Sequence, residues 1–210
     1  MNRERQGLLI IFEGIDGAGK TTQARRVTAW LKEQGLPAAS FSEPSPHGVY
    51  GKKLRQIILH GREKITPQEE MELFLKDREE DVQKNILPAL MQGSIVVMDR
   101  YYYSNMAYQG ALGIDVNHIQ ALNEKIAPRP DMVIILDLDA QAGLHRINTL
   151  RREKENHFER EDYLRKVSQI FREMKGDHIY HLPASRPLEE VNAEVDRLIM
   201  GLVQKRILPR

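Results

Sequence analysis

Short apolar runs recur along the chain and are separated by longer stretches of mixed polarity. Leu8–Phe12 is the clearest of them, because it is continuous rather than alternating, which is typical of a strand buried on both faces. On this pattern we expect five strands, at Leu8–Phe12, Ala38–Ser42, Ile95–Met98, Met132–Leu136 and His178–Leu182.

Helical patterns fill the gaps between these runs. The segment TPQEEMELFLKDREEDVQKNIL begins with Thr66 as N-cap, Pro67 at the first helical position and Glu69 completing a capping box. Near the end of the chain, apolar residues at positions 188, 191, 195, 198, 199 and 202 predict an amphipathic helix. Strands that alternate with helices predict an α/β fold, a parallel sheet covered by helices on both faces. Ligands of such sheets bind beyond the carboxyl ends of the strands.

The segment GIDGAGKTTQ, residues 14–23, lies between the first predicted strand and a predicted helix. It fits the pattern G-x-x-x-x-G-K-[ST], in which backbone N–H groups wrap phosphates, Lys20 meets the terminal phosphates and Thr21 meets Mg²⁺. The alternative is a glycine-rich turn, but the order of strand, loop and helix directs a helix N-terminus at a bound anion. We therefore expect a nucleoside triphosphate to bind Gly14, Ile15, Asp16, Gly17, Ala18, Gly19, Lys20, Thr21 and Thr22.

The composition is that of an ordinary globular domain, with 41% hydrophobic and 29% charged residues among 210. We expect a single domain over residues 1–210. Because 31 Lys and Arg balance 30 Asp and Glu, net charge does not favour binding to nucleic acid or to membrane. The absence of cysteine excludes disulfides and cysteine nucleophiles. No apolar stretch has the length of a membrane span and MNRERQG lacks the apolar part of a signal peptide, so we expect a cytoplasmic protein.

Asp99 and Arg100 close the third apolar run. An Asp at the rim of a buried strand beside a phosphate loop commonly orients Mg²⁺ or its waters, and an Arg offers a planar fork of donors to a phosphate. The alternative is a solvated ion pair at the end of a strand. The preceding phosphate loop favours the first interpretation, so we expect Mg²⁺ near Thr21 and Asp99, bound directly or through water.

Two further clusters are ambiguous. Phe74 and Arg78 lie four residues apart, on one helix face, where they could stack on and hydrogen-bond a nucleobase. Spacing alone favours a core Phe beside a solvated Arg. Arg55 follows the Glu43-Pro44 turn in a basic stretch, which fits either a second phosphate pocket or, more simply, solvated surface.

Residues 145–157, HRINTLRREKENH, are polar and rich in arginine and join two predicted helices. This segment is either a lid that brings Arg146, Arg151 or Arg152 onto transferring phosphates or an exposed charged connection. The seven histidines do not show the spacing H-E-x-x-H or a similar one, and no set of protein metal ligands is visible in the sequence.

From FEGIDGAGKTTQ through EP, LFLKDR and DRYYYSNMAYQG to LDLDAQAGLHR and FEREDYLRKV, the chain resembles the bacterial thymidylate kinases, which belong to the P-loop nucleoside-monophosphate kinases. The resemblance spans nearly the whole chain. It implies a P-loop NTPase fold with a five-stranded parallel sheet, a homodimer, and transfer of the γ-phosphate of MgATP to dTMP.

The resemblance also implies roles for matching residues. Asp16 would meet the acceptor deoxyribose, Phe74 would stack on thymine and Arg78 would bond the edge of the base. The remaining acceptor-binding residues are Glu43, Arg55, Arg100, Ser104, Asn105, Tyr108 and Gln109, with Arg55 and Arg100 on the acceptor phosphate. The catalytic residues are then Lys20, Arg100 and Asp16, together with Arg151 and Arg152 from the lid.

The sequence departs from the family pattern twice. The usual R-E-P-G-G is replaced by SEPSP at residues 42–46, which leaves open a different acceptor such as dUMP, UMP or CMP. The usual arginine before Phe-Glu near the lid is His157, which leaves open which lid arginine is catalytic. A P-loop module that only senses or hydrolyses nucleotide is a further alternative, although the chain lacks a guanine-reading N-K-x-D stretch.

Overall fold

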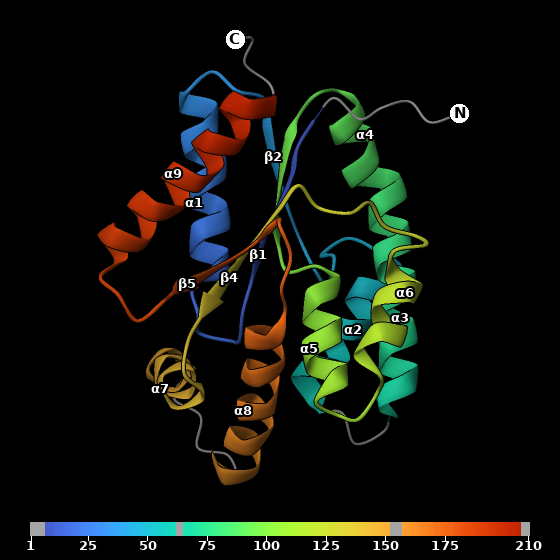
Figure 1. Cartoon of the computed structure of the whole chain (residues 1–210). Coiled ribbons are helices and arrows are strands. Elements are labelled where there is room, and N and C mark those ends of the chain that lie inside the picture. The colour runs from blue at the N-terminus through green and yellow to red at the C-terminus, as the bar shows by residue number, and fades with distance from the viewer. Residues whose placement is uncertain (1–6, 62–64, 152–156, 207–210) are drawn as a thin grey trace.

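A computed structural model describes residues 7–61, 65–151 and 157–206, with side chains described outside 148–160 (Figure 1). These residues form a five-stranded sheet in the order β2-β3-β1-β4-β5, in which every neighbouring pair is parallel. The strands are β1 (Leu9–Glu13), β2 (Ala38–Ser42), β3 (Ile95–Asp99), β4 (Met132–Asp137) and β5 (Ile179–Pro183). The predicted five-stranded parallel sheet is therefore confirmed, with strand ends shifted by one residue at most.

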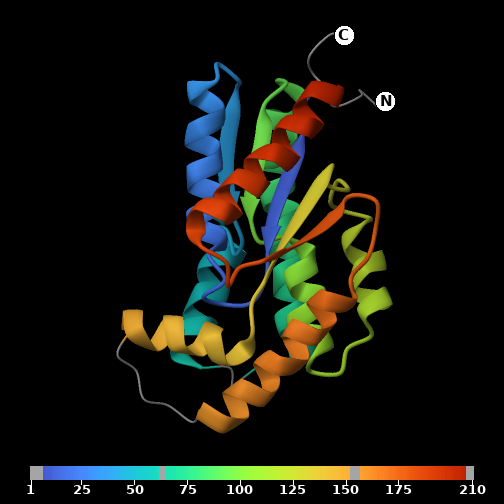
Figure 2. The ribbon, with the colours of Figure 1, turned by 60° about the vertical axis from the view of Figure 1, so that its left-hand side comes forward.

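The helices lie on both faces of this sheet, α1 and α9 on one face and α4 and α5 on the other (Figures 1 and 2). Their bounds are α1 (Lys20–Glu33), α2 (Val49–His60), α3 (Pro67–Asp81), α4 (Leu87–Met91), α5 (Tyr102–Gly110), α6 (Val116–Asn123), α7 (Ala140–Arg151), α8 (His157–Glu173) and α9 (Leu188–Arg206). A π-helical turn, η1 (Val82–Ile86), joins α3 to α4. Within the described ranges, no helix has the length and apolar character needed to cross a membrane.

Burial follows the position of each strand in the sheet. Every residue of the central strand β1 is buried, as its continuous apolar run predicts. The residues of β2 are half-buried or exposed, because β2 is an edge strand with a neighbour on one side only. The sheet thus holds the carboxyl ends of β1 and β3 side by side in the interior, with Phe12 opposite Asp99.

Two sequence expectations about helices have different outcomes. The capping box of α3 is present, since the Thr66 hydroxyl accepts the Glu69 N–H and the Glu69 carboxylate accepts the Thr66 N–H. The expected connection over residues 145–157 is too long, because α7 continues to Arg151 and α8 begins at His157. A polar and arginine-rich sequence can also form a helix with one solvated side. Composition alone therefore placed the end of α7 too early in the chain.

Candidate active site

The loop between β1 and α1 is shaped by glycines with positive φ. Gly14, Gly17 and Gly19 have φ angles of 132°, 82° and 98°. A Cβ on Gly14 would lie 2.6 Å from the Leu136 carbonyl oxygen, and one on Gly17 would lie 2.7 Å from that of Gly143. These positions therefore require glycine for both conformation and space. The loop leads directly into α1, whose first N–H groups have no side-chain cap from Gly19 and can bind an anion.

Lys20 is buried at the start of α1. Its ammonium group donates a hydrogen bond to the Ile15 carbonyl, with 2.7 Å between the two atoms. Burial and, to a lesser extent, the nearby charge of Arg100 lower the pKa of Lys20 to about 8, although the carboxylates of Asp16, Asp99 and Glu13 act in the opposite direction. A bound phosphate would relieve both effects by supplying opposite charge.

Thr21 and Asp99 meet at the same edge of the sheet. The Thr21 hydroxyl donates a hydrogen bond to Asp99 Oδ2 at 2.5 Å, although the residues lie 78 positions apart in the sequence. The two oxygen ligands predicted for Mg²⁺ are therefore brought together beside the phosphate loop. Among the described residues, no group of three or more His, Cys, Asp or Glu has the arrangement of a metal site. One carboxylate and one hydroxyl suit an ion that takes most of its ligands from phosphates and water.

Arg100 connects the phosphate loop with α5. Its Nη2 donates to Asp16 Oδ1 at 2.5 Å and its Nη1 donates to Ser104 Oγ at 2.9 Å. The guanidinium carbon lies 5.1 Å from the centre of the Tyr108 ring, within the range of a cation–π contact. The backbone of Arg100 has φ 71°, which is rare for a residue other than glycine. This conformation directs the side chain towards the loop.

Glu13 is a residue of this site that the sequence interpretation missed. It ends β1, is fully buried, and accepts hydrogen bonds from the backbone of Tyr101 and from Ser104. Burial raises the pKa of the Glu13 carboxyl, while Arg100, Ser104, Tyr101 and Lys20 lower it. The signal was available, since Glu13 closes an apolar run just as Asp99 does.

Arg78 lies in a second part of the site, and it is not the solvated residue that its spacing favoured. It is 1% exposed, and its Nε and Nη2 donate to the two carboxylate oxygens of Glu43, with 2.9 Å between Nε and Oε1. Its Nη1 donates to Asn123 Oδ1, and its guanidinium carbon lies 5.4 Å from the centre of the Tyr101 ring. Burial raises the pKa of Glu43 and the charge of Arg78 lowers it. Among the described residues, three of the five N–H groups of Arg78 are therefore hydrogen-bonded, to Glu43 and Asn123.

Phe74 lies one helical turn before Arg78 and is only half-buried. It does not belong to the hydrophobic core, whereas its neighbours Met71 and Leu73 are buried. The expectation of a core Phe is therefore wrong, and Phe74 is left partly exposed one turn before Arg78. This arrangement is compatible with stacking on a base.

The turn after β2 is held by an Asp rather than by the glycines usual in this pattern. Asp77 Oδ2 accepts the Ser45 N–H at 2.8 Å and Asp77 Oδ1 accepts the Ser45 hydroxyl at 2.6 Å. Arg55 is exposed, and its Nη2 donates to the Pro44 carbonyl at 2.5 Å. Arg55 therefore lies against the turn that carries Glu43.

The remaining predicted acceptor residues lie on α5. Ser104 and Tyr108 contact Arg100, with 3.4 Å between Arg100 Nη2 and the Tyr108 hydroxyl. Asn105 Nδ2 donates to Gln109 Oε1, and Gln109 Nε2 donates to Glu70 Oε2, both at 3.1 Å. The buried Asn105 Oδ1 has no hydrogen-bond partner among the described residues. An unpaired buried acceptor costs free energy, so this atom is a candidate contact for a ligand donor.

The predicted lid is only partly described. Arg146, on α7, donates from Nη1 to the Gly17 carbonyl at 3.2 Å and from Nη2 to the Ala184 carbonyl at 2.9 Å. It therefore contacts the phosphate loop itself. The side chain of Arg151 and the whole of Arg152 lie outside the described residues, so their catalytic role stays a prediction.

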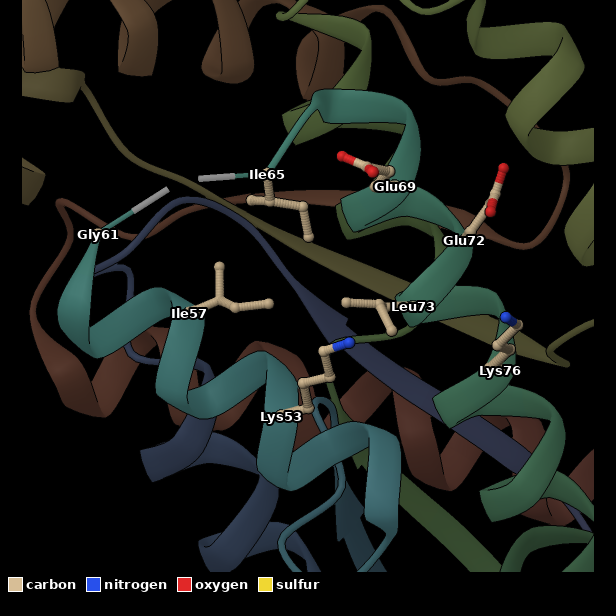
Figure 3. A pocket seen from close by; sticks show the side chains of 8 residues that line it. All are labelled: Lys53, Ile57, Gly61, Ile65, Glu69, Glu72, Leu73 and Lys76. Carbon is tan, nitrogen blue, oxygen red and sulfur yellow. The ribbon is translucent and has the colours of Figure 1, made fainter. Parts of the chain in front are cut away.

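A pocket of about 390 Å³ lies elsewhere, between α2 and α3 (Figure 3). Ile57 and Lys53 of α2 face Leu73 of α3 across it. Its lining residues are Lys53, Ile57, Gly61, Ile65, Glu69, Glu72, Leu73 and Lys76, and none of these is a predicted site residue.

Comparison with known proteins gives a consistent result. The family model described as "Thymidylate kinase" matches residues 12–195. A "Probable thymidylate kinase" of Archaeoglobus fulgidus is 49% identical over 192 residues, which cover 91% of this chain and 94% of that protein. A "Thymidylate kinase" of Desulfotalea psychrophila is 44% identical over 94% of this chain and 96% of that protein. A "Thymidylate kinase" of Xanthomonas oryzae pv. oryzae is 42% identical over 96% of this chain and 86% of that protein.

Proposed function

The chain belongs to the thymidylate kinase family, and we propose that it transfers the γ-phosphate of ATP to dTMP, giving ADP and dTDP. The observation that carries this proposal is the pairing of two separate features in one site. Cationic Lys20 and Arg100 flank the phosphate loop, and a half-buried Phe74 with a partly unpaired Arg78 lies on the acceptor side. The cations at the phosphate loop suit a triphosphate, and Phe74 with Arg78 suits a pyrimidine base.

The reaction needs charge neutralisation more than a general base. The phosphate of dTMP is mostly dianionic at neutral pH, because its second pKa is about 6, so one of its oxygens is already a nucleophile. This oxygen bonds to the γ-phosphorus while the bond to the β,γ-bridging oxygen breaks, and ADP leaves with that electron pair. Lys20 and the N–H groups of α1 bind the donor phosphates, and Arg100 and Arg55 bind the acceptor phosphate. The cations thereby offset the repulsion between the two anions.

We propose that Mg²⁺ binds with ATP at Thr21 and Asp99. The two oxygen donors meet at 2.5 Å beside the first turn of α1, which suits an ion held by one or two protein groups and by phosphates. The bound ion supplies neutralisation of charge on the β- and γ-phosphates. Asp16 of the phosphate loop accepts a hydrogen bond from Arg100, and we propose that it also contacts the acceptor sugar.

Recognition of the base follows from the fixed direction of Arg78. Because Glu43 and Asn123 hold three of its N–H groups, the remaining two point in a defined direction and donate to a carbonyl of thymine. Phe74 stacks on the ring, and Asn105 Oδ1 accepts from the base, which satisfies its missing bond.

We further propose a homodimer that works in the cytoplasm, where ATP and dTMP are available. Support for the dimer comes from apolar side chains left exposed on α2, where Val49 and Leu59 are 73% and 71% exposed and Ile58 is 46% exposed. Light scattering should give twice the 24.3 kDa mass of one chain. A mass of one chain at micromolar concentration would contradict the dimer.

The reaction is tested with MgATP and a panel of acceptors, dTMP, dUMP, UMP and CMP, by following ADP and the nucleoside diphosphate. We expect the highest kcat/KM with dTMP. A preference for another acceptor would contradict the assigned substrate, and ATP hydrolysis without transfer would contradict the assigned reaction. The Lys20→Ala variant is the control for contaminating kinases, since it should lose the transfer.

A further inference from the structure

The carboxylate of Glu13 caps a helix to which it is not adjacent in the sequence. Glu13 Oε1 accepts the Tyr101 N–H at 2.7 Å and the Ser104 N–H at 3.1 Å. Tyr101 is the N-cap of α5 and Ser104 is its third residue, so these are the two donors that a capping box satisfies. Tyr101 offers no side-chain cap of its own. The end of β1 therefore fixes the start of α5.

The same carboxylate is linked to Arg100 through one hydroxyl group. Glu13 Oε2 accepts the Ser104 O–H at 2.6 Å, and the Ser104 oxygen in turn accepts from Arg100 Nη1 at 2.9 Å. Because Glu13 takes the hydroxyl hydrogen, a lone pair of Ser104 is left facing the guanidinium. The direction of the Arg100 side chain thus depends on Glu13 through Ser104.

The backbone at Arg100 is held by β1 on both sides of the turn. The Arg100 N–H donates to the Phe12 carbonyl at 3.0 Å, and the next N–H, that of Tyr101, donates to Glu13. A non-glycine residue with φ 71° persists only where its surroundings determine the conformation. Phe12 and Glu13 provide those surroundings.

We propose that Glu13 is a positioning residue for phosphoryl transfer, which fixes the Arg100 turn and, through the Ser104 hydroxyl, aims the Arg100 guanidinium at the phosphates. The inference rests on the proposed function. Glu13 is fully buried and its carboxylate is hydrogen-bonded to Tyr101 and Ser104, so it acts through these residues. Its role differs from that of Asp99, whose carboxylate meets Thr21 at the proposed Mg²⁺ site.

The Glu13→Gln variant tests the link from Glu13 through the Ser104 hydroxyl to Arg100. Glutamine keeps the size of the side chain and one oxygen for the two backbone N–H groups, but its amide replaces the acceptor that faces the Ser104 hydroxyl. We expect kcat for dTMP to fall by roughly 10- to 100-fold, the scale of misplacing a catalytic group by about 1 Å. The KM for ATP should change little, because the phosphate loop is intact.

Double variants separate positioning from a purely structural cap. In the Ser104→Ala and Arg100→Ala backgrounds the link is already broken, so Glu13→Gln should change kcat by no more than about twofold. Ser104→Ala leaves both backbone bonds to Glu13 in place and should by itself reproduce the loss seen with Glu13→Gln. Glu69→Gln is the matched control, since Glu69 also caps a helix but lies in the α3 capping box, and its kcat should be that of the wild type.

Two results would overturn the role of Glu13. One is a normal kcat in Glu13→Gln, and the other is an equal loss of kcat in all three backgrounds, which a structural cap alone would give. Failure of the wild-type chain to phosphorylate dTMP would instead contradict the proposed function, so the two failures are distinguishable. Thermal unfolding of each variant shows that the compared proteins are folded.

Discussion

The proposed donor and acceptor halves of the site hold their cations in different ways. On the donor side, Lys20 donates to the Ile15 carbonyl of the phosphate loop, and Arg100, which we assign to the acceptor phosphate, is held against the same loop by the half-exposed Asp16. On the acceptor side, Arg78 is fully buried, and its partners Glu43 and Asn123 come from two other segments of the chain. Removal of Lys20 leaves no hydrogen-bonded carboxylate without its cation, because Lys20 donates to a carbonyl, whereas removal of Arg78 leaves the buried Glu43 carboxylate without its partner. We therefore expect donor-side changes to reduce turnover and acceptor-side changes to reduce stability as well.

Arg78→Ala should have the largest effect. It leaves the buried Glu43 carboxylate without its cation, and breaking a buried pair typically costs about 3–5 kcal/mol in the free energy of unfolding. The KM for dTMP should rise in the fraction that remains folded. Chemical denaturation and steady-state kinetics measure the two effects, and unchanged stability would show that Arg78 and Glu43 do not depend on each other.

The double variant Glu43→Gln/Arg78→Met is the control for this prediction. Replacing both members of a buried ion pair by neutral groups is often close to neutral for stability. Stability should therefore recover while the KM for dTMP stays high. Recovery of both properties would mean that Arg78 has no part in binding the base.

Lys20→Ala should reduce kcat by about 10²- to 10³-fold, as loss of one preorganised electrostatic contact does. Stability should stay near that of the wild type, because the substitution removes a buried charge instead of stranding its partner. Steady-state kinetics and thermal unfolding of the same preparation test this contrast. A folded Lys20→Ala protein with near-normal kcat would contradict the donor-side assignment.

Asn123→Ala should lower stability and weaken dTMP binding, as Arg78→Ala does, but by less. It removes one of three hydrogen bonds to Arg78, and a bond to a charged group contributes about 1.5–3 kcal/mol. We expect a lower free energy of unfolding and a raised KM for dTMP, with the KM for ATP unchanged. An equal rise in both KM values would show that the two halves are not separable.

The pH dependence should distinguish the halves further. In the ligand-free enzyme the pKa of Lys20 is about 8, so kcat/KM for ATP should decline by up to about tenfold per pH unit above that value. Arg100 stays charged over this range, because its pKa is raised. The folded state binds the Lys20 proton less tightly than the unfolded state does. The contribution of Lys20 to stability therefore rises with pH between about 8 and the usual 10.5.

A pH–rate profile from pH 6 to pH 10 tests this prediction. Bound phosphates favour the ammonium form, so the decline in kcat should begin at a higher pH than the decline in kcat/KM. A flat kcat/KM profile up to pH 10 would contradict a lowered pKa for Lys20.

Thr66→Ala should have the smallest effect. It removes the N-cap of α3, which costs about 1 kcal/mol of stability. Because Phe74 and Arg78 lie two or more turns further along α3, kcat and both KM values should stay at the wild-type level. A raised KM for dTMP in this variant would show that the acceptor side depends on the start of the helix.

The same contrast explains what the sequence could and could not predict. The phosphate loop is a local pattern, and the Thr21–Asp99 contact follows from the rule that parallel strands end at one edge. The partners of Arg78 lie 35 and 45 residues away, and no local spacing encodes them. Spacing on one helix therefore favoured a solvated arginine, which is wrong. Glu13 was overlooked because its partners are backbone groups of a distant helix, although it ends an apolar run as Asp99 does.

A crystal structure with dTMP and a non-hydrolysable ATP analogue is the most direct test of how the two halves work together. We predict that phosphate oxygens lie between Lys20 and Arg100 and that thymine lies between Phe74 and the free N–H groups of Arg78. A complex in which Lys20 and Arg100 face away from each other with no anion between them, or in which the base lies away from Arg78, would contradict the account.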